Sequence, residues 1–296
     1  MRRVLFHVRG VPVWSYPTLL YVGLLCGFYV MYAIAPSLGM NRVPASIATL
    51  IMFVPAIAGS RIWFVLDHWA VYRHDPRRIW RHSDGGMTLY GGLVLALVLS
   101  PVILTPLGLR FAAFWDGATF TILVGMIFTR VGCLLNRCCS GRRSDGRLGM
   151  WLPDHTGRWQ RRYPVQLLEL AAASVLLAGS AALLAVDTPR GTIFAFALVG
   201  YTAARLAIDP LRERQTHAKA RRPVALAAFL ACSVLASALG PIWIGPVVGG
   251  GDLQRPRQRC HGQVSVEMAV AVRGVVEIVA DVLPGASDAD GHIVVG

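Results

Sequence analysis

The chain has 296 residues, of which 55% are hydrophobic and only 15% are charged, with a mean hydropathy of +0.53 and a net charge of +13. Apolar stretches long enough to cross a bilayer recur along it, so the composition indicates a polytopic membrane protein with an all-α fold. The unbroken apolar runs argue against an outer-membrane barrel, and basic residues dispersed over short loops argue against nucleic-acid binding.

We predict a bundle of about seven transmembrane helices, each about twenty residues long, as a hydrocarbon core about 30 Å thick requires. The predicted spans are residues 17–36, 45–66, 87–106, 112–135, 164–186, 191–208 and 223–248. Residues 1–248 form the predicted transmembrane domain. The basic start and Ala33-Ile34-Ala35 are compatible with a cleavable signal peptide, but the first apolar run is longer than the usual run of about 7–15 residues.

The first two spans each carry a polar residue near one predicted helix end. Tyr16 precedes the first apolar run, and Arg61 lies near the end of the second. A guanidinium group in a bilayer is costly, so it usually marks a functional site, unless it pairs with an acid or snorkels to the interface. Cys26, within the first span, is most simply a small apolar core residue.

The third span begins with closely spaced glycines. The turn Asp84-Gly85-Gly86-Met87 is followed by Tyr90, Gly91 and Gly92. Small residues permit close backbone approach, and that approach can serve a ligand or the packing of two helices. Both explanations stay open for these glycines.

The fourth span carries a row of polar residues at its end. Arg130, Cys133 and, less closely, Asn136 or Arg137 follow one another at three- to four-residue spacing, which aligns them along one side of a helix. Asp116 lies about fourteen residues before Arg130, which is about 20 Å at 1.5 Å per residue. We therefore expect that Asp116 does not neutralise Arg130.

Three cysteines gather at the end of the fourth span, at Cys133, Cys138 and Cys139. Their spacing matches no two-by-two zinc pattern. We favour a packing role, and we predict neither a metal nor a cofactor. A disulfide or redox pair and a metal site are the alternatives.

A second polar row lies at the end of the sixth span. Tyr201, Arg205 and Asp209 are spaced four residues apart, so they share a helix face, and Arg205 and Asp209 are expected to pair. If the spans alternate across the membrane, Asp67, Glu169 and Asp209 lie on the same membrane face as Arg61, Arg130 and Arg205. These three acids can neutralise only some of the basic residues there.

Basic residues are distributed very unevenly between the two faces. The odd-numbered loops hold one arginine each, whereas the N-terminus and the even-numbered loops together hold nineteen Lys and Arg. The positive-inside rule would make the basic face cytoplasmic. The same arginines would also bind an anionic partner such as lipid phosphate through charge-assisted hydrogen bonds, so the membrane orientation stays open at this point.

The last 48 residues, 249–296, differ in character from the rest. Gly249–Gly251 resembles a flexible linker, and the apolar, β-branched stretch beyond it is interrupted by charges, so helix and strand cannot be distinguished. We expect an appended C-terminal extension that is partly disordered.

Five motifs together resemble the bacterial prolipoprotein diacylglyceryl transferase family, in a divergent branch with a Cys-rich signature. They cover about residues 10–215, and five motifs in the right order on the right spans are specific although each alone is weak. The motifs are GSR from Gly59, DGGMTLYGGL from Asp84, RVGCLLNRCCSG from Arg130, RYPVQLLE from Arg162 and GYTAARLAIDPLR from Gly200.

The resemblance implies a multi-pass enzyme of the bacterial inner membrane. Such an enzyme transfers the diacylglyceryl group of phosphatidylglycerol to the thiol of a lipobox cysteine in a preprolipoprotein, and glycerol phosphate leaves. Arg130 and Arg205 would hold the phosphate and stabilise its departing charge, while Tyr16 and Asn136 would orient the headgroup. The assigned substrate-binding residues are Tyr16, Arg61, Gly91, Gly92, Asn136, Gly141, Tyr201 and Asp209. In this family the reactive face looks toward the outer leaflet.

Two departures from the family pattern bear on catalysis. Tyr90, which we assign as catalytic, stands where the family commonly has a histidine, and tyrosine is a poor base because its unperturbed pKa is about 10; His82 or His68 could activate the thiol instead. Cys133 and Cys138 replace the usual Asn and Glu of the signature. The alternatives are a non-catalytic lipid-binding or scaffold paralogue and a redox protein that uses the three cysteines.

Overall fold

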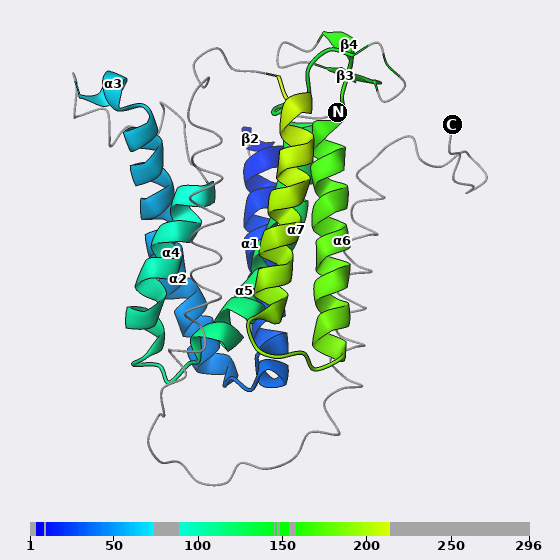
Figure 1. Cartoon of the computed structure of the whole chain (residues 1–296). Coiled ribbons are helices and arrows are strands. Elements are labelled where there is room, and N and C mark those ends of the chain that lie inside the picture. The colour runs from blue at the N-terminus through cyan, green and yellow to red at the C-terminus, as the bar shows by residue number, and fades with distance from the viewer. Residues whose placement is uncertain are drawn as a thin grey trace. The chain divides into compact units, whose positions relative to one another are not determined.

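The protein is mostly helical, as the sequence predicts. The computed structural model describes residues 4–8, 10–73, 89–144, 146, 149–153 and 158–213 (Figure 1). Five helices are long and apolar enough to cross a membrane, so the predicted class of polytopic membrane protein is confirmed. They are α1 (Ser15–Ile34, continued by a short 3₁₀ helix, Ala35–Leu38), α2 (Arg42–Asp67), α5 (Phe111–Leu135), α6 (Val165–Ala185) and α7 (Thr192–Ile208, followed by the 3₁₀ turn Asp209–Leu211).

The count of seven spans is not confirmed. The third predicted span corresponds to α4 (Leu89–Leu104), an apolar helix of 16 residues that is shorter than the others. The predicted seventh span, 223–248, and the proposed C-terminal extension, 249–296, lie outside the described residues. A short helix α3 (Trp69–Tyr72) follows α2.

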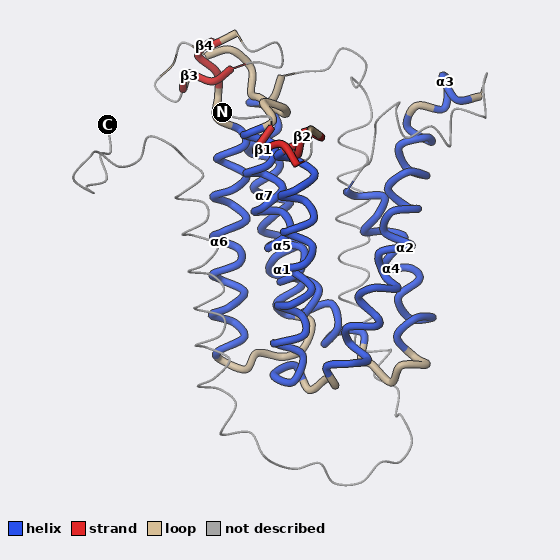
Figure 2. The backbone as a smooth tube through the Cα atoms, turned by 180° about the vertical axis from the view of Figure 1, so that it is seen from behind, coloured by secondary structure: helices blue, strands red, loops and turns tan. Residues whose placement is uncertain are grey.

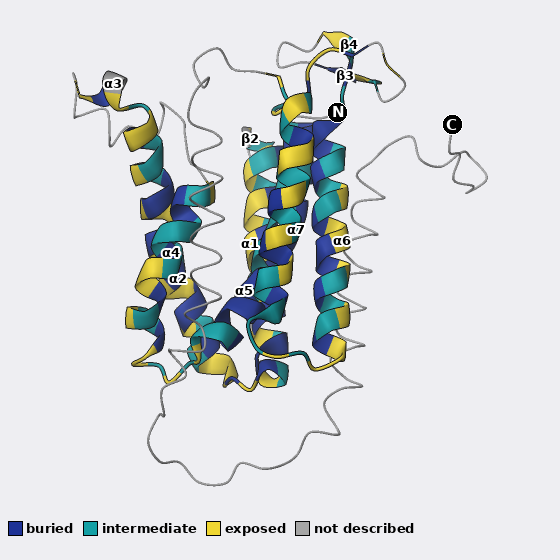
Figure 3. Cartoon of the chain, in the orientation of Figure 1, coloured by how far each residue is buried: buried dark blue, intermediate teal, exposed yellow. Residues whose placement is uncertain are grey.

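Helix α5 forms the centre of the described bundle. It packs against α1, α6 and α7, and its aromatic residues Phe114, Phe120 and Phe128 are almost completely buried. Figure 3 shows outward faces of α1, α2 and α7 as exposed, and these exposed residues are largely apolar, as expected of helices that face lipid. The residues that end α5 are therefore positioned by contacts with three other helices.

Helices α2 and α4 form a tightly packed pair that both Figure 1 and Figure 2 show side by side. A Cβ atom added to Gly59 would lie 2.4 Å from the carbonyl oxygen of Gly91, and one added to Gly92 would lie 2.5 Å from that of Ala56. Only glycine allows backbones to approach this closely. Gly91 and Gly92, which we assigned to substrate binding, thus serve helix packing in this structure.

Two antiparallel hairpins, which the sequence analysis did not predict, lie at the same end of the helices (Figure 2). Strands β1 (Val4–Val8) and β2 (Val11–Trp14) pair just before α1. Strands β3 (Met150–Pro153) and β4 (Trp159–Arg162) pair between α5 and α6, with Met150 opposite Arg162. The second hairpin holds the loop that follows α5 against the start of α6.

Asp116 caps the N-terminus of α7 instead of neutralising Arg130. Its carboxylate accepts hydrogen bonds from the backbone N–H groups of Gly191 (2.7 Å) and Phe194 (2.9 Å), and the residue is 1% exposed. These two donors belong to the first turn of the helix, which has no intrahelical acceptor for them. The prediction that Asp116 and Arg130 do not pair is consistent with this role.

We expect Asp116→Ala to lower the free energy of unfolding by about 1–2 kcal/mol, because it removes the cap and leaves two buried donors without an acceptor. The measurement is thermal unfolding of the purified protein in detergent. Asp187→Asn is the matched control, since Asp187 is half exposed and its ion pair of 3.6 Å with Arg190 is worth well under 1 kcal/mol, while asparagine tolerates its left-handed backbone (φ 49°). Equal losses in the two variants would contradict the capping role.

Candidate functional site

A charged cluster lies where α5 ends, α6 begins and α7 ends, and Glu169 is at its centre. Glu169 stands one turn into α6, and its side chain is only 2% exposed. A carboxylate this deeply buried requires positive partners, because an unpaired buried charge is strongly destabilising. Three arginines from different segments supply them.

The three arginines are Arg130 from α5, Arg205 from α7 and Arg212 from the turn after α7. The Nε atom of Arg130 lies 3.0 Å from Oε2 of Glu169. Arg205 and Arg212 each donate a hydrogen bond from a terminal nitrogen to Oε1 of the same carboxylate. We name this group, together with Asp209, the arginine cluster.

Asp209 is the second acid of the arginine cluster. Its carboxylate lies 3.4 Å from Nε of Arg205 and 3.8 Å from Nε of Arg212. The predicted pairing of Arg205 with Asp209 is therefore observed. Sequence analysis overestimated the unneutralised charge at these two arginines, because it did not place Glu169 between them.

The arginine cluster keeps one net positive charge, since three guanidinium groups face two carboxylates. Arginine offers five N–H donors in a planar fork that matches phosphate and carboxylate oxygens. The cluster is thus suited to an anion with a single negative charge.

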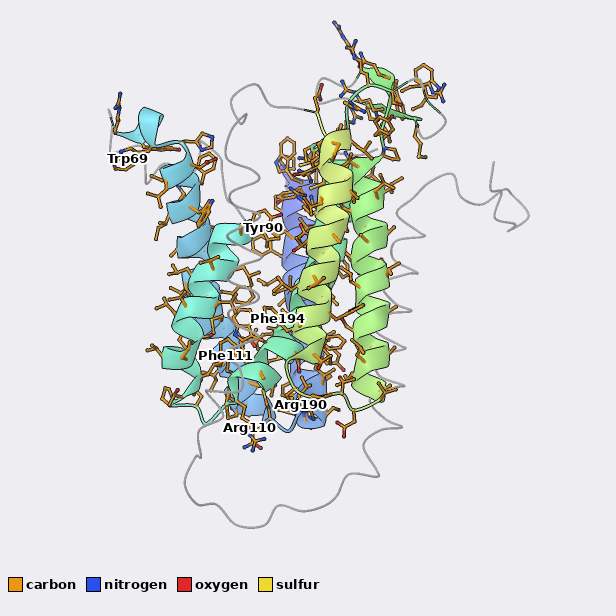
Figure 4. The ribbon with its side chains drawn as sticks, in the orientation of Figure 1. Trp69, Tyr90, Arg110, Phe111, Arg190 and Phe194 are labelled. Atoms are coloured by element: carbon orange, nitrogen blue, oxygen red, sulfur yellow. The ribbon has the colours of Figure 1, made fainter. Side chains whose placement is uncertain are left out.

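Two tyrosines lie beside the arginine cluster. Tyr90, at the start of α4, has a side-chain hydrogen bond with Arg205 and interacts electrostatically with Tyr201. Figure 4 shows Tyr90 extending from α4 toward α1 and α7, whereas Arg110 and Arg190 lie at the opposite end of the helices. Tyr90, Tyr201, Arg130 and Arg205 are therefore brought together from three helices.

Arg61 is not part of these ion pairs. Its guanidinium group lies 5.7 Å from the ring centre of Phe64 and 5.8 Å from that of Tyr72, at the end of the α2 helix. Helix α2 packs mainly on α4, while Arg130 and Arg205 lie on α5 and α7. The assignment of Arg61 to substrate binding stays a prediction.

The chain reverses sharply after α5. Asn136 ends the helix, and Arg137 and Cys139 both have a left-handed backbone with φ of 60°. The N–H groups of Arg137 and Cys138 bond back to the carbonyls of Leu134 (3.2 Å) and Cys133 (3.1 Å). This is the hydrogen-bond pattern of a Schellman helix end. Our expectation that Arg137 extends the helical row from Arg130 is wrong, because the helix stops at Leu135.

Gly141 holds the reversed loop against the start of α6. A Cβ atom there would lie 2.3 Å from the carbonyl oxygen of Tyr163, so only glycine fits. The carbonyl of Gly141 accepts a hydrogen bond from Arg162 (3.2 Å), and Gln166 donates one to the carbonyl of Cys138 (2.8 Å). Gly141 therefore positions the loop.

The loop carries Cys138 and Cys139 back toward Cys133, which lies in the last turn of α5. The sulfur atoms of Cys133, Cys138 and Cys139 all lie within 4.8 Å of one another, and none forms a disulfide within the described residues. Hydrogen bonds from Cys133 and Cys138 lower the pKa of the Cys139 thiol, and the guanidinium groups of Arg130 and Arg212 lower it further.

Tyr16 and Asn136 lie next to these cysteines. Tyr16 packs on Gly132, where an added Cβ atom would meet its Cα atom at 3.4 Å, and it interacts electrostatically with Arg130 and the three thiols. The Asn136 side chain is hydrogen-bonded to Cys138. The two residues that we expected to orient a headgroup therefore lie beside the cysteines.

His68, one of the two histidines considered as bases, lies outside this cluster. His68 stacks on Phe64 with ring centres 4.3 Å apart, and its Nδ1 atom lies 3.0 Å from the Phe64 carbonyl oxygen, at the end of α2. His82 and the turn Asp84–Met87 lie outside the described residues.

An apolar pocket adjoins the arginine cluster within the bundle. It has a volume of about 60 Å³ and is lined by α4, α5 and α7, from Tyr201 beside Arg205 to Phe194 seven residues earlier on α7. At 1.5 Å per residue this is a run of about 10 Å along the helix. Its other lining residues include Leu93, Leu123 and Ala197.

Sequence reasoning missed several residues of the site. Arg212 was quoted within a motif without a role, and Glu169 was considered only as one of three acids on the same face. Arg162 and Gln166, which hold the loop, were not assigned. The signal for Arg212 was its spacing, since it follows Asp209 by three residues and Arg205 by seven, which is two helical turns.

Comparison with known proteins gives a consistent result. The family model described as prolipoprotein diacylglyceryl transferase matches residues 3–244. A protein of Clostridium perfringens named phosphatidylglycerol–prolipoprotein diacylglyceryl transferase 2 is 26% identical over 156 residues, which cover 52% of this chain and 60% of that protein. Proteins of Bacillus mycoides and Bacillus cereus named phosphatidylglycerol–prolipoprotein diacylglyceryl transferase are 26% and 27% identical over 221 residues, covering 71% of this chain and 80% of each relative.

Proposed function

Because the chain belongs to the prolipoprotein diacylglyceryl transferase family, we propose that it transfers the diacylglyceryl group of phosphatidylglycerol to the lipobox cysteine of prolipoproteins. The observation that carries this proposal is the convergence of Arg130, Arg205 and Arg212 on the buried Glu169. Together with Asp209, this arrangement has one net positive charge and lies beside an apolar pocket. We further propose that this multi-pass membrane protein is located in the bacterial inner membrane.

In the proposed complex the lipid phosphate binds to the arginine cluster. A phosphodiester carries one negative charge, which balances the one net positive charge of the cluster. The forked donors of Arg130 and Arg205 suit phosphate oxygens, whereas Glu169 and Asp209 fix the orientation of the forks. Tyr90, Tyr201 and Tyr16 can donate hydrogen bonds to the glycerol headgroup from the edge of the cluster.

The apolar pocket receives part of one acyl chain. Its volume of about 60 Å³ fits a few methylene groups and not a complete chain. Burial of each methylene contributes about 0.8 kcal/mol. The pocket would therefore fix the glycerol end of the lipid relative to Arg205.

The transfer itself is an alkylation of sulfur. The thiolate of the acceptor cysteine attacks the glycerol carbon that is bonded to the phosphate oxygen. A carbon–sulfur bond forms, the carbon–oxygen bond breaks, and its electron pair leaves with glycerol phosphate. The leaving phosphate gains a second negative charge, and preorganised guanidinium groups stabilise that charge. The thiol must lose its proton before or during the attack.

The test is transfer in a defined system. The purified full-length protein is placed in phosphatidylglycerol liposomes with a lipobox peptide, and the products are analysed by mass spectrometry. We expect the peptide to gain one diacylglyceryl group, with one glycerol phosphate released per thioether. Liposomes of phosphatidylcholine and a peptide with serine in place of the cysteine should give no product. No thioether from the cysteine peptide in phosphatidylglycerol would contradict the proposal.

Filling the apolar pocket should weaken the binding of phosphatidylglycerol. We expect Ala197→Phe to raise the KM for phosphatidylglycerol about tenfold with little change in kcat, because it displaces two or three buried methylene groups of the substrate. The assay is the liposome reaction at varied lipid content. Ala203→Phe, on the exposed side of the same helix, is the matched control. An unchanged KM in Ala197→Phe would exclude the pocket as an acyl site.

A further inference from the structure

The three signature cysteines form a compact group that has no role in the proposed transfer. Cys133 lies in the last turn of α5, and Cys138 and Cys139 lie in the loop that follows. Their three sulfur atoms lie within 4.8 Å of one another, which is close enough for all three to contact one metal ion. Cys133 is buried, Cys138 is half-buried and Cys139 is exposed, so the group opens to the outside on one side.

The backbone adopts a strained conformation where the sulfur atoms come together. Arg137 and Cys139 are in the left-handed region although neither is glycine, and each such residue costs about 1–2 kcal/mol. The loop is nevertheless held by Gln166, by the Schellman hydrogen bonds and by the close packing of Gly141 on Tyr163. Backbone strain of this kind is found where a site fixes the geometry of its side chains.

We propose that Cys133, Cys138 and Cys139 bind one zinc ion. Zinc–sulfur bonds of about 2.3 Å in a tetrahedral arrangement place sulfur atoms about 3.8 Å apart, so shifts of about 1 Å bring these three into place. Soft thiolate ligands favour zinc among the divalent ions common in proteins. Three protein ligands leave the fourth position open, which is the composition of a catalytic zinc site.

The charge of the surroundings fits such an ion. Zinc with three thiolates carries one net negative charge, and Arg130 and Arg212 interact electrostatically with Cys139. Arg130 precedes Cys133 by three residues, which is a rise of about 4.5 Å along α5, so one helix end contributes a residue to both sites. The two sites are therefore close enough to hold two parts of one reaction.

The zinc site supplies the thiol activation that the substitution at Tyr90 removes; this role rests on the proposed transferase function. A thiol that coordinates zinc is deprotonated outright, so the acceptor cysteine would release its proton to solvent on taking the open position. The bound thiolate then attacks the glycerol carbon whose phosphate is held by Arg130 and Arg205. Neither a basic tyrosine nor a histidine is needed.

Metal binding is measured independently of transfer. The full-length protein is purified in detergent with a thiol-free reductant, equilibrated with zinc, freed of unbound metal, and analysed for zinc by mass spectrometry. We expect about one zinc per chain, and a large loss in Cys133→Ser, Cys138→Ser and Cys139→Ser but none in Cys26→Ser, a cysteine within α1. Cobalt in place of zinc should show sulfur-to-metal charge-transfer absorption, which Cys139→Ser should weaken.

The results separate this inference from the function on which it rests. Wild-type protein without zinc, zinc bound equally by Cys139→Ser, or a disulfide among these cysteines in protein kept free of oxidants would overturn the metal site. A cobalt spectrum that changes on addition of the cysteine peptide, but not of the serine peptide, would support the open position.

If metal-free protein transfers diacylglyceryl at the full rate, the zinc role is wrong and the transferase function stands. If zinc is bound and no condition gives transfer, the site stands and its role in transfer is overturned together with the transferase function.

Discussion

Replacing Arg130 with alanine is expected to lower kcat for diacylglyceryl transfer by about 10²–10³-fold. Removing one preorganised donor from a developing negative charge has an effect of this size in other enzymes, and in the proposed complex Arg130 lies between the phosphate and the acceptor thiol. The protein should still fold, because Glu169 keeps its hydrogen bonds to Arg205 and Arg212. The measurement is single-turnover transfer in phosphatidylglycerol liposomes, with thermal unfolding of each variant measured in parallel.

Two further variants define the cause of the loss. Arg130→Lys keeps the charge without the planar fork, so we expect it to recover only a small part of the activity. Arg190→Ala removes an arginine at the opposite end of the helices, where Arg190 pairs with Asp187 and donates to the Ser37 carbonyl (Figure 4). It should transfer at the wild-type rate. Full activity in a folded Arg130→Ala protein would show that this guanidinium group does not take part.

Replacing Glu169 with glutamine is expected to have the largest effect on stability, a loss of about 3–5 kcal/mol. The change removes the charge that three guanidinium groups share in a site where Glu169 is 2% exposed, and breaking a buried ion pair on one side leaves the other charges uncompensated. Asp209 would then be the only carboxylate in the arginine cluster. Thermal unfolding in detergent measures the loss.

A second substitution tests whether charge is the cause. In Glu169→Gln, the additional change Arg212→Gln should restore part of the lost stability, because it removes one of the excess positive charges. Asp67→Asn is the control, since Asp67 is 37% exposed and lies 3.9 Å from His68, and it should change stability by less than about 1 kcal/mol. If Glu169→Gln unfolds at the wild-type temperature, Glu169 does not hold the arginine cluster together.

The helices of the bundle could largely be predicted from the sequence, because bilayer thickness fixes the length of an apolar span. Helices α1, α2, α5, α6 and α7 lie close to their predicted limits. The hairpins β1–β2 and β3–β4 could not be predicted in this way, because strands of four or five residues depend on tertiary contacts and carry only weak local signals.

The candidate site could be predicted only in part. Spacing placed Arg130 on one helix face and Tyr201, Arg205 and Asp209 on another, and these faces do meet. Spacing cannot give the rotation of one helix relative to another, so the central position of Glu169 was not predicted.

The cysteines come together through a backbone conformation that sequence patterns rarely reveal. A left-handed residue at a helix end is usually glycine, and Arg137 and Cys139 carry no such signal. A regular continuation of α5 would have spread Cys133, Cys138 and Cys139 over different sides of the helix. The sharp reversal after Asn136 instead gathers their sulfur atoms.

The central claim is that the arginine cluster holds an anionic lipid headgroup. The most direct measurement is the Kd of the purified protein for phosphatidylglycerol and for phosphatidylcholine of the same chain length, in wild type and in Arg205→Ala. We predict that the wild type prefers phosphatidylglycerol at least tenfold, because the trimethylammonium group of phosphatidylcholine offsets its phosphate charge and the arginine cluster has one net positive charge. Arg205→Ala should lose this preference, because it removes that net charge. Equal affinity of the wild type for the two lipids would contradict the claim.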